Sequence, residues 1–190
     1  MKANALADRL VSALRRWNVP PVKSERDLDL KVRDFLRLHV VRLVPQLRRL
    51  PPERRPLELM CCVAGHGGPK QNRRCWTASK PYQNVRLWGS GKTADLFVYD
   101  SRGKYGLPRR GISVEIKYIP RGASYAGAIA TVAGQLLAYS LRHVRTIGFV
   151  LCEERRRDRI IRHEGDEDRS EAFLKALPRK ATLIVRFRRP

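Results

Sequence analysis

Two apolar segments, 93–99 and 111–119, constrain the fold of this chain most strongly. Both are rich in β-branched and aromatic residues, and the stretch 100–110 between them contains two glycines and a proline. This pattern predicts two neighbouring strands of one sheet, joined by a long hairpin loop. Because side chains alternate between the two faces of a strand, Glu115 and Lys117 are expected on one face, opposite the Ile and Val side chains of the same segment.

Three charged side chains interrupt this apolar pair. Asp95 lies in the middle of the first segment, and Glu115 and Lys117 lie in the second. Charged groups are costly to bury in a sheet unless they pair with each other or bind a metal ion. The sequence therefore predicts either a structural ion pair or a functional site at these positions.

The length of the chain limits the number of domains, and its charge indicates the kind of partner. Its 190 residues predict one α/β domain at 23–190, preceded by an N-terminal helical extension at 1–22. Forty Lys and Arg residues against 18 Asp and Glu give a formal net charge of +22. A polyanionic partner is therefore expected, and nucleic acid is favoured over a membrane because the charge is spread along the chain. The alternative is a nonspecific charge that follows from an arginine-rich composition.

Several features predict a soluble protein of a reducing compartment. The four cysteines are irregularly spaced, and the first residues lack a signal-peptide pattern, so we expect a cytoplasmic or nucleoid-associated location. Nothing between Arg121 and Arg142 is charged, but this segment contains several polar residues and many small ones. It is expected to form a helix buried in protein and not a membrane span.

Hydrophobic periodicity predicts alternating helices and strands along the rest of the chain. Ser24 has the features of a helix N-cap, and Pro45 ends the same helix. Glu25, in its first turn, either answers the helix dipole or belongs to a site. The order predicts a mixed α/β domain: helices at 4–17, 24–44, 125–141 and 170–177, strands at 57–63, 85–88, 146–152 and 181–187, and loops at 46–56 and 66–74.

Two tempting motifs are rejected. The Gly-Lys-Thr at 91–93 lacks the upstream glycine of a phosphate-binding loop, because Arg86 stands at that position, and a strand is expected after it in place of a helix. Cys61, Cys62, His66 and Cys75 do not have the spacing of a zinc site. Buried free thiols explain these cysteines better.

Asp95, Glu115 and Lys117 fit a metal-assisted hydrolysis. Two carboxylates on adjacent strands can hold Mg²⁺, which prefers oxygen ligands. A lysine two residues beyond Glu115 emerges on the same face, where it can orient a water or neutralise developing charge. The alternative is a salt bridge on an exposed sheet face.

These residues resemble the motifs of the PD-(D/E)XK, or restriction-endonuclease-like, nuclease superfamily. The resemblance rests on Ala94-Asp95 followed by Glu115-Ile116-Lys117, with Ala94 in place of the proline. It continues in Gln135 and Tyr139, which resemble the Gln-xxx-Tyr motif of the RecB-like branch. The segment 24–28, Ser-Glu-Arg-Asp-Leu, is similar to the Holliday-junction resolvases within that superfamily.

The resemblance implies an αβββαβ core over about 24–153, with a mixed sheet flanked by helices. It implies Mg²⁺ or Mn²⁺ as cofactor, held by the carboxylates of Asp95 and Glu115 and the backbone carbonyl of Ile116. Lys117 would serve the attacking water and Gln135 would support the site. Glu25 would match the glutamate that many members carry on the first core helix.

The expected substrate contacts are basic and aromatic side chains. Tyr139 is expected to contact the nucleic acid, and phosphate contacts are expected from five arginines: Arg73, Arg74, Arg109, Arg110 and Arg121. Three further aromatic residues either stack on bases or belong to the core: Trp76, Tyr82 and Trp88.

The expected function is a metal-dependent deoxyribonuclease acting in DNA repair, recombination or restriction. The sequence leaves open whether the DNA is duplex, branched or single-stranded, whether the protein is an endonuclease or an exonuclease, and whether it forms a homodimer. The alternatives are an inactive nuclease-fold protein that binds nucleic acid and a basic structural protein that binds RNA.

Overall fold

The structure is a computed structural model that describes residues 3–66, 70–83, 85–87, 90–100, 111–153 and 175–188. Its helices are α1 Ala3–Arg16, α2 Glu25–Leu43, α3 Pro45–Arg48, α4 Arg55–Cys62, α5 Lys70–Gln83 and α6 Tyr125–Ser140. Its strands are β1 Val63–Gly65, β2 Val85–Leu87, β3 Ser90–Lys92, β4 Leu96–Val98, β5 Ile112–Ile119, β6 Arg145–Cys152 and β7 Ala181–Phe187.

A mixed sheet of five strands, in the order β1-β4-β5-β6-β7, organises the fold. β1, β4 and β5 pair antiparallel, whereas β5, β6 and β7 pair parallel. The helix α6 makes the crossover that the parallel pair β5 and β6 requires. β2 and β3 form a separate antiparallel hairpin. The mixed α/β sheet flanked by helices, as predicted from the sequence, is confirmed.

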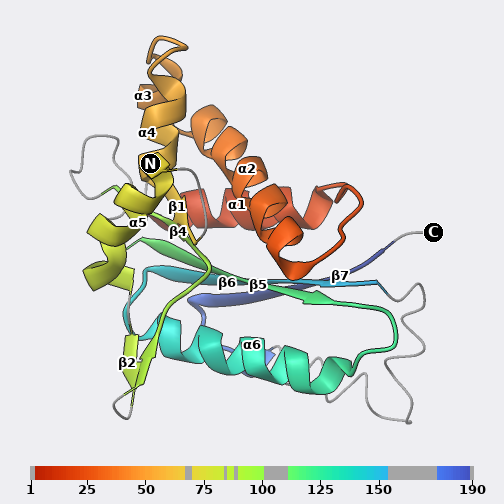
Figure 1. Ribbon diagram of the computed structural model, residues 1–190. Helices are drawn as coiled ribbons and strands as arrows, with labels where there is room; N and C mark the ends of the chain where they lie inside the picture. The colour runs from red at the N-terminus through yellow and green to blue at the C-terminus, as the bar shows by residue number, and fades with distance from the viewer. Residues whose placement is uncertain are drawn as a thin grey trace.

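Helices cover both faces of the sheet (Figure 1). α1 and α2 lie on one face, where Ile112, Val114 and Ile116 of β5 join their apolar side chains in one buried cluster. α6 lies on the opposite face, where Val132 and Leu136 pack against β6 and β7. β5 is therefore covered on both faces, which explains its nearly continuous burial.

The N-terminal helix α1 is part of this core. Leu6, Leu10 and Leu14 recur at helical spacing and are at most 1% exposed. They join the same cluster as α2 and β5, and α1 contacts β6 and β7. The apolar stripe of the predicted N-terminal helix thus packs onto the sheet of the α/β domain.

Local sequence signals determine where α2 begins and ends. The Ser24 side chain accepts a hydrogen bond of 3.2 Å from the Asp27 amide, as a capping box predicts. The helix ends at Leu43, before Pro45. Between these ends, Leu28, Val32 and neighbouring apolar residues face the sheet. The first turn of α2 is therefore held at a defined place beside β5.

The structure differs from the sequence-based prediction between 55 and 83. The predicted strand 57–63 is wrong over most of its length, because α4 occupies Arg55–Cys62 and only β1 follows it. The predicted loop 66–74 is wrong from Lys70 onward, where α5 begins. In α5 the buried residues Asn72 and Trp76 are one turn apart, so they share the face that packs on β1.

The predicted loop 46–56 is wrong at its two ends, where the short helix α3 occupies Pro45–Arg48 and α4 begins at Arg55. The remaining elements agree more closely with the structure. The helices 4–17, 24–44 and 125–141 and the strands 146–152 and 181–187 are confirmed within one or two residues. Most of the predicted helix 170–177 lies outside the described residues. Among the residues that the structure describes, no helix has the length and apolar character needed to cross a bilayer.

Candidate active site

The register between β4 and β5 brings Asp95 to Glu115. The strands pair antiparallel with Leu96 opposite Val114, so that Asp95 directly precedes the paired segment and Glu115 directly follows it. The Asp95 carboxylate accepts a hydrogen bond of 2.8 Å from the Ile116 amide. The Asp95 amide in turn donates to the Glu115 carboxylate. The two acids predicted from neighbouring strands therefore lie side by side where the strands separate.

Strand geometry places the Ile116 carbonyl at the same edge. In an extended strand, the N–H and the C=O of one residue point to the same side. The Ile116 N–H points to Asp95, while the Gly111 and Ile119 carbonyls accept hydrogen bonds on the β6 side. The carbonyl oxygen of Ile116 is therefore directed to the edge of β5 that Asp95 occupies. This geometry supplies a third oxygen beside the two carboxylates.

Helix α6 holds the Glu115 side chain from the other direction. Gln135 Nε2 donates to Glu115 Oε1 at 2.6 Å, and Tyr139 Oη donates to Oε2 at 3.1 Å. Gln135 and Tyr139 are four residues apart and share one face of α6. Glu115 is only 7% exposed, and these two donors fix both of its oxygens. The predicted link between the β5 acid and the Gln-xxx-Tyr pair is present in the geometry.

A glycine on β6 permits this close approach of α6. Gly148 pairs with Glu115 across the parallel ladder. A Cβ atom at Gly148 would lie 2.8–3.0 Å from side-chain atoms of Leu183, Val132 and Leu136. Since real Cβ atoms do not tolerate such contacts, the side chains of α6 and β7 that pack over this position would have to move. The absence of a side chain at 148 therefore helps to position the Gln135 and Tyr139 donors.

Burial raises the pKa values of both acids. The pKa of Glu115 rises to about 8, mainly because burial disfavours its charge and secondly because Asp95 is close. Burial likewise raises the pKa of Asp95 to about 6, against the hydrogen bond from the Ile116 amide, which lowers it. Two neighbouring carboxylates in a partly dry site repel each other when both are ionised. A cation placed between them would remove this cost.

The donor set fits a divalent cation that prefers oxygen ligands. Asp95, Glu115 and the Ile116 carbonyl are hard oxygen donors, and Mg²⁺ commonly uses one or two carboxylates and keeps several waters. Among the described residues, no group of three or more His, Cys, Asp or Glu side chains is placed to hold one metal ion. The fit therefore rests on two carboxylates and one backbone carbonyl.

Lys117 and Glu25 form an ion pair next to these acids. Lys117 Nζ lies 2.8 Å from Glu25 Oε2, with the two side chains 37% and 49% exposed. The same Glu25 oxygen accepts a long hydrogen bond of 3.4 Å from the Tyr118 amide. Glu25 thus contacts β5 directly from the first turn of α2. The helix dipole alone does not account for its position.

Asp29 is an acid of this region that the sequence reasoning missed. It follows Glu25 by one turn of α2, and its Oδ1 atom is buried without a hydrogen-bond partner. Burial, followed by the proximity of Asp95, raises the pKa of Asp29 to about 7. The sequence feature that could have identified Asp29 is its spacing of four residues from Glu25, which places both acids on one face of the helix. It is hard to recognise in a segment where charged residues are frequent.

The predicted nucleic-acid contacts are dispersed. Arg73 and Arg74 are exposed on α5, and Arg121 is exposed in the turn after β5. Arg109 and Arg110 lie outside the described residues. Tyr139 is fully buried against Glu115, so its predicted contact with DNA is wrong and its role is internal.

The structure describes only some of the aromatic residues and cysteines for which the sequence made predictions. Trp76 is 9% exposed and joins a buried cluster with Phe97 and Tyr99, which supports its reading as core. Trp88 lies outside the described residues, and the Tyr82 side chain is not described. Of the thiols expected to be buried, Cys62 is buried and Cys75 is only half-buried, and Cys152 is buried as well.

Comparison with known proteins adds no relative: no protein-family model, no curated protein and no solved structure matches this chain.

Proposed function

We propose that this protein is a metal-dependent nuclease of the PD-(D/E)XK type, which hydrolyses phosphodiester bonds in DNA. The observation that carries the proposal is the meeting of Asp95 and Glu115 where β4 and β5 separate, with Gln135 and Tyr139 bonded to Glu115. A buried acid and a half-buried acid, both of raised pKa, at the edge of a sheet are typical of a functional site. If α3, α4, α5 and the β2–β3 hairpin are taken as insertions, the elements α2, β1, β4, β5, α6 and β6 follow each other as the αβββαβ order of this superfamily requires, which supports the proposal.

Asp95, Glu115 and the Ile116 carbonyl would hold Mg²⁺ or Mn²⁺. Such an ion lowers the pKa of a bound water and stabilises negative charge on phosphoryl oxygens. Gln135 and Tyr139 keep the Glu115 carboxylate in one orientation, because each donates to a different oxygen. The protein thereby presents its acids to the scissile phosphate without reorganisation.

Lys117 is the cation of the site. Its position two residues after Glu115 places it on the same face of β5. The ion pair with Glu25 holds the ammonium group near the edge that the acids occupy. In the proposed reaction Lys117 orients the attacking water and neutralises charge that develops on the phosphate. Glu25 acts through Lys117 and is therefore a positioning residue.

The net charge of +22 supports DNA as the substrate. Arg73, Arg74 and Arg121 are exposed and contribute to phosphate binding in this proposal. Arg109 and Arg110, in the segment between β4 and β5, belong to the same proposed contact set. We further propose a cytoplasmic or nucleoid location and a homodimer where both strands of a duplex are cut.

A panel of labelled linear duplex, branched and single-stranded DNA tests the function. The protein is incubated with each substrate in Mg²⁺, in Mn²⁺ and in EDTA. Cleavage of at least one substrate with either ion, and none in EDTA, is expected. Binding of DNA without cleavage in any condition would refute the enzyme and favour the inactive nuclease-fold protein. Preference for RNA, again without cleavage, would favour the basic RNA-binding protein.

A further inference from the structure

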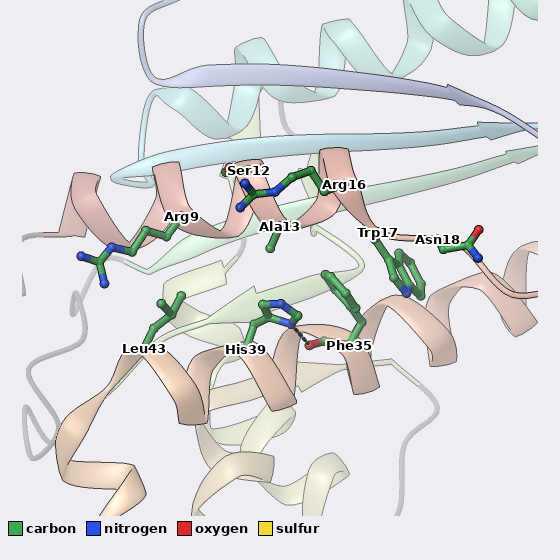
Figure 2. Close-up of a pocket in the computed structure, with 9 residues that line it drawn as sticks. All are labelled: Arg9, Ser12, Ala13, Arg16, Trp17, Asn18, Phe35, His39 and Leu43. Atoms are coloured by element: carbon green, nitrogen blue, oxygen red, sulfur yellow. Dashed lines mark hydrogen bonds between the residues drawn. The ribbon is translucent and has the colours of Figure 1, made fainter.

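A groove between α1 and α2 is separate from the acidic site. Its volume is about 540 Å³, within the range of small-ligand pockets. α1 supplies one wall and α2 the other, as Figure 2 shows. Phe35 and His39 of α2 line it, respectively ten and fourteen residues after Glu25. At a rise of about 1.5 Å per residue, they lie roughly 15 and 21 Å along the helix from Glu25.

Three aromatic rings form a row in this groove. The rings of Trp17 and Phe35 stack at 4.4 Å with an angle of 25° between their planes. The His39 ring follows at 4.1 Å from Phe35. All three side chains are half-buried. Trp17 also contacts the core ring of Phe149 at 5.9 Å, so a flat aromatic ligand would extend the row at its other end, beside His39. Stacking of a base on an aromatic side chain is worth about 1–3 kcal/mol.

His39 has a defined hydrogen-bonding role in the row. Its Nδ1 atom lies 3.0 Å from the Phe35 carbonyl oxygen. Since a carbonyl only accepts hydrogen bonds, Nδ1 is the donor, and Nε2 of the neutral ring is then an acceptor. The ring orientation is thus held by the helix backbone. Nε2 is left as a polar group that a ligand can use.

Two arginines give the groove its charge. Arg9 and Arg16 extend from α1 and are exposed. They are seven residues apart, about two turns of one helix face. In the part of the chain that the structure describes, neither guanidinium has an ion-pair or hydrogen-bond partner. None of the nine lining residues is acidic, so the groove is complementary to an anion.

We propose that this groove binds an unpaired nucleotide of single-stranded DNA. The base extends the row of Trp17, Phe35 and His39, and Arg9 and Arg16 each pair with one of the two phosphates that flank the nucleotide. Aromatic stacking joined to basic side chains is the chemistry by which proteins bind single strands without sequence preference. The groove is independent of the proposed nuclease site, because it lies between α1 and α2 and not at the β4–β5 edge.

Binding of a labelled decathymidylate, measured by fluorescence anisotropy in EDTA, tests the proposal. EDTA prevents metal-dependent cleavage, so the result does not depend on nuclease activity. The variant Arg9→Ala/Arg16→Ala is compared with Arg15→Ala/Arg48→Ala, which removes the same charge from exposed arginines that do not line the groove. Circular dichroism and thermal melting establish that both variants are folded.

We expect the groove variant to bind at least about tenfold more weakly, and the control variant to bind within about twofold of the wild type. The slope of log K against log salt concentration should fall by about 1.4 for the loss of two phosphate contacts. Equal weakening by both variants, or no weakening by the groove variant, would overturn the proposal.

Photocrosslinking locates the base. A decathymidylate with one 4-thiothymidine, and 4-thiothymidine 5′-monophosphate as the free nucleotide, are irradiated with the protein and the peptides are analysed by mass spectrometry. Crosslinks at Trp17, Phe35 or His39 with the oligonucleotide support a strand segment as ligand. Crosslinks there with the free nucleotide alone, or with neither probe, contradict it.

Discussion

Replacing Glu115 by Gln should make the metal-free protein more stable at alkaline pH. The folded protein holds the pKa of Glu115 at about 8, above the ordinary value of 4.5. The folded state therefore binds a proton that the unfolded state has lost between these values. Stability must fall as the pH rises from about 4.5 to about 8. A glutamine side chain at this position has no proton to lose, so the E115Q variant escapes this loss.

The size of the effect follows from the pKa difference. A rise from 4.5 to about 8 corresponds to about 5 kcal/mol at one pKa unit per 1.36 kcal/mol, as an upper bound. Local relaxation and entry of water reduce this value, so we expect about 2–5 kcal/mol at pH 8.5. The amide fits the site, because the Tyr139 hydroxyl both donates and accepts and the Gln135 amide can reverse its orientation.

Urea unfolding in EDTA at pH 5.0 and pH 8.5 measures the difference. Glu115→Gln should raise the free energy of unfolding at pH 8.5 and leave it nearly unchanged at pH 5.0. Glu53→Gln, at an exposed position, is the matched control and should have no effect at either pH. Addition of Mg²⁺ at pH 8.5 should stabilise the wild type and not the variant. Equal destabilisation of Glu115→Gln at both pH values would refute the electrostatic account of the site.

Three further substitutions probe the supports of the site. Gly148→Ala should lower cleavage at least about tenfold and destabilise the protein by about 1–3 kcal/mol, because the added Cβ displaces the side chains of Val132 and Leu136 on α6, the helix that carries Gln135 and Tyr139; unchanged melting and activity would contradict the packing at this glycine. Glu25→Gln should lower the cleavage rate about tenfold but change stability by at most about 1 kcal/mol, since its pair with Lys117 is half-exposed; an unchanged rate would remove Glu25 from the site. Asp29→Asn should stabilise the protein in EDTA above pH 7 and not at pH 4, because burial raises the pKa of Asp29 to about 7; pH-independent melting differences would contradict this.

Local patterns predicted the central part of the fold well. β5, α6 and β6 lie where the apolar pattern indicated. The two strands are buried over most of their length, whereas α6 buries only the face that packs on the sheet. The face shared by Glu115 and Lys117 also followed from alternation alone. The proximity of Asp95 to Glu115 did not follow from a local pattern, because the register between β4 and β5 depends on long-range contacts between the two strands.

The features that the sequence did not predict depend on contacts between separate segments of the chain. α5 is polar over most of its surface, and only a narrow face, with Asn72 and Trp76, contacts β1. Its helical form therefore depends on packing more than on a visible apolar stripe. Asp29 was missed because its proximity to Asp95 depends on tertiary packing, which the sequence of its own helix does not reveal. The aromatic groove combines residues of α1 and α2, so no single segment reveals it.

Single-turnover cleavage of DNA by wild type and Asp95→Asn, at equal concentration and with matched thermal stability, shows whether cleavage depends on a metal ion held by Asp95. We expect Mg²⁺-dependent cleavage by the wild type and a rate at least about 10³-fold lower in the variant, because Asn lacks the charge that holds the ion. Cleavage by Asp95→Asn at the wild-type rate would contradict the account and place the activity elsewhere in the protein or outside it.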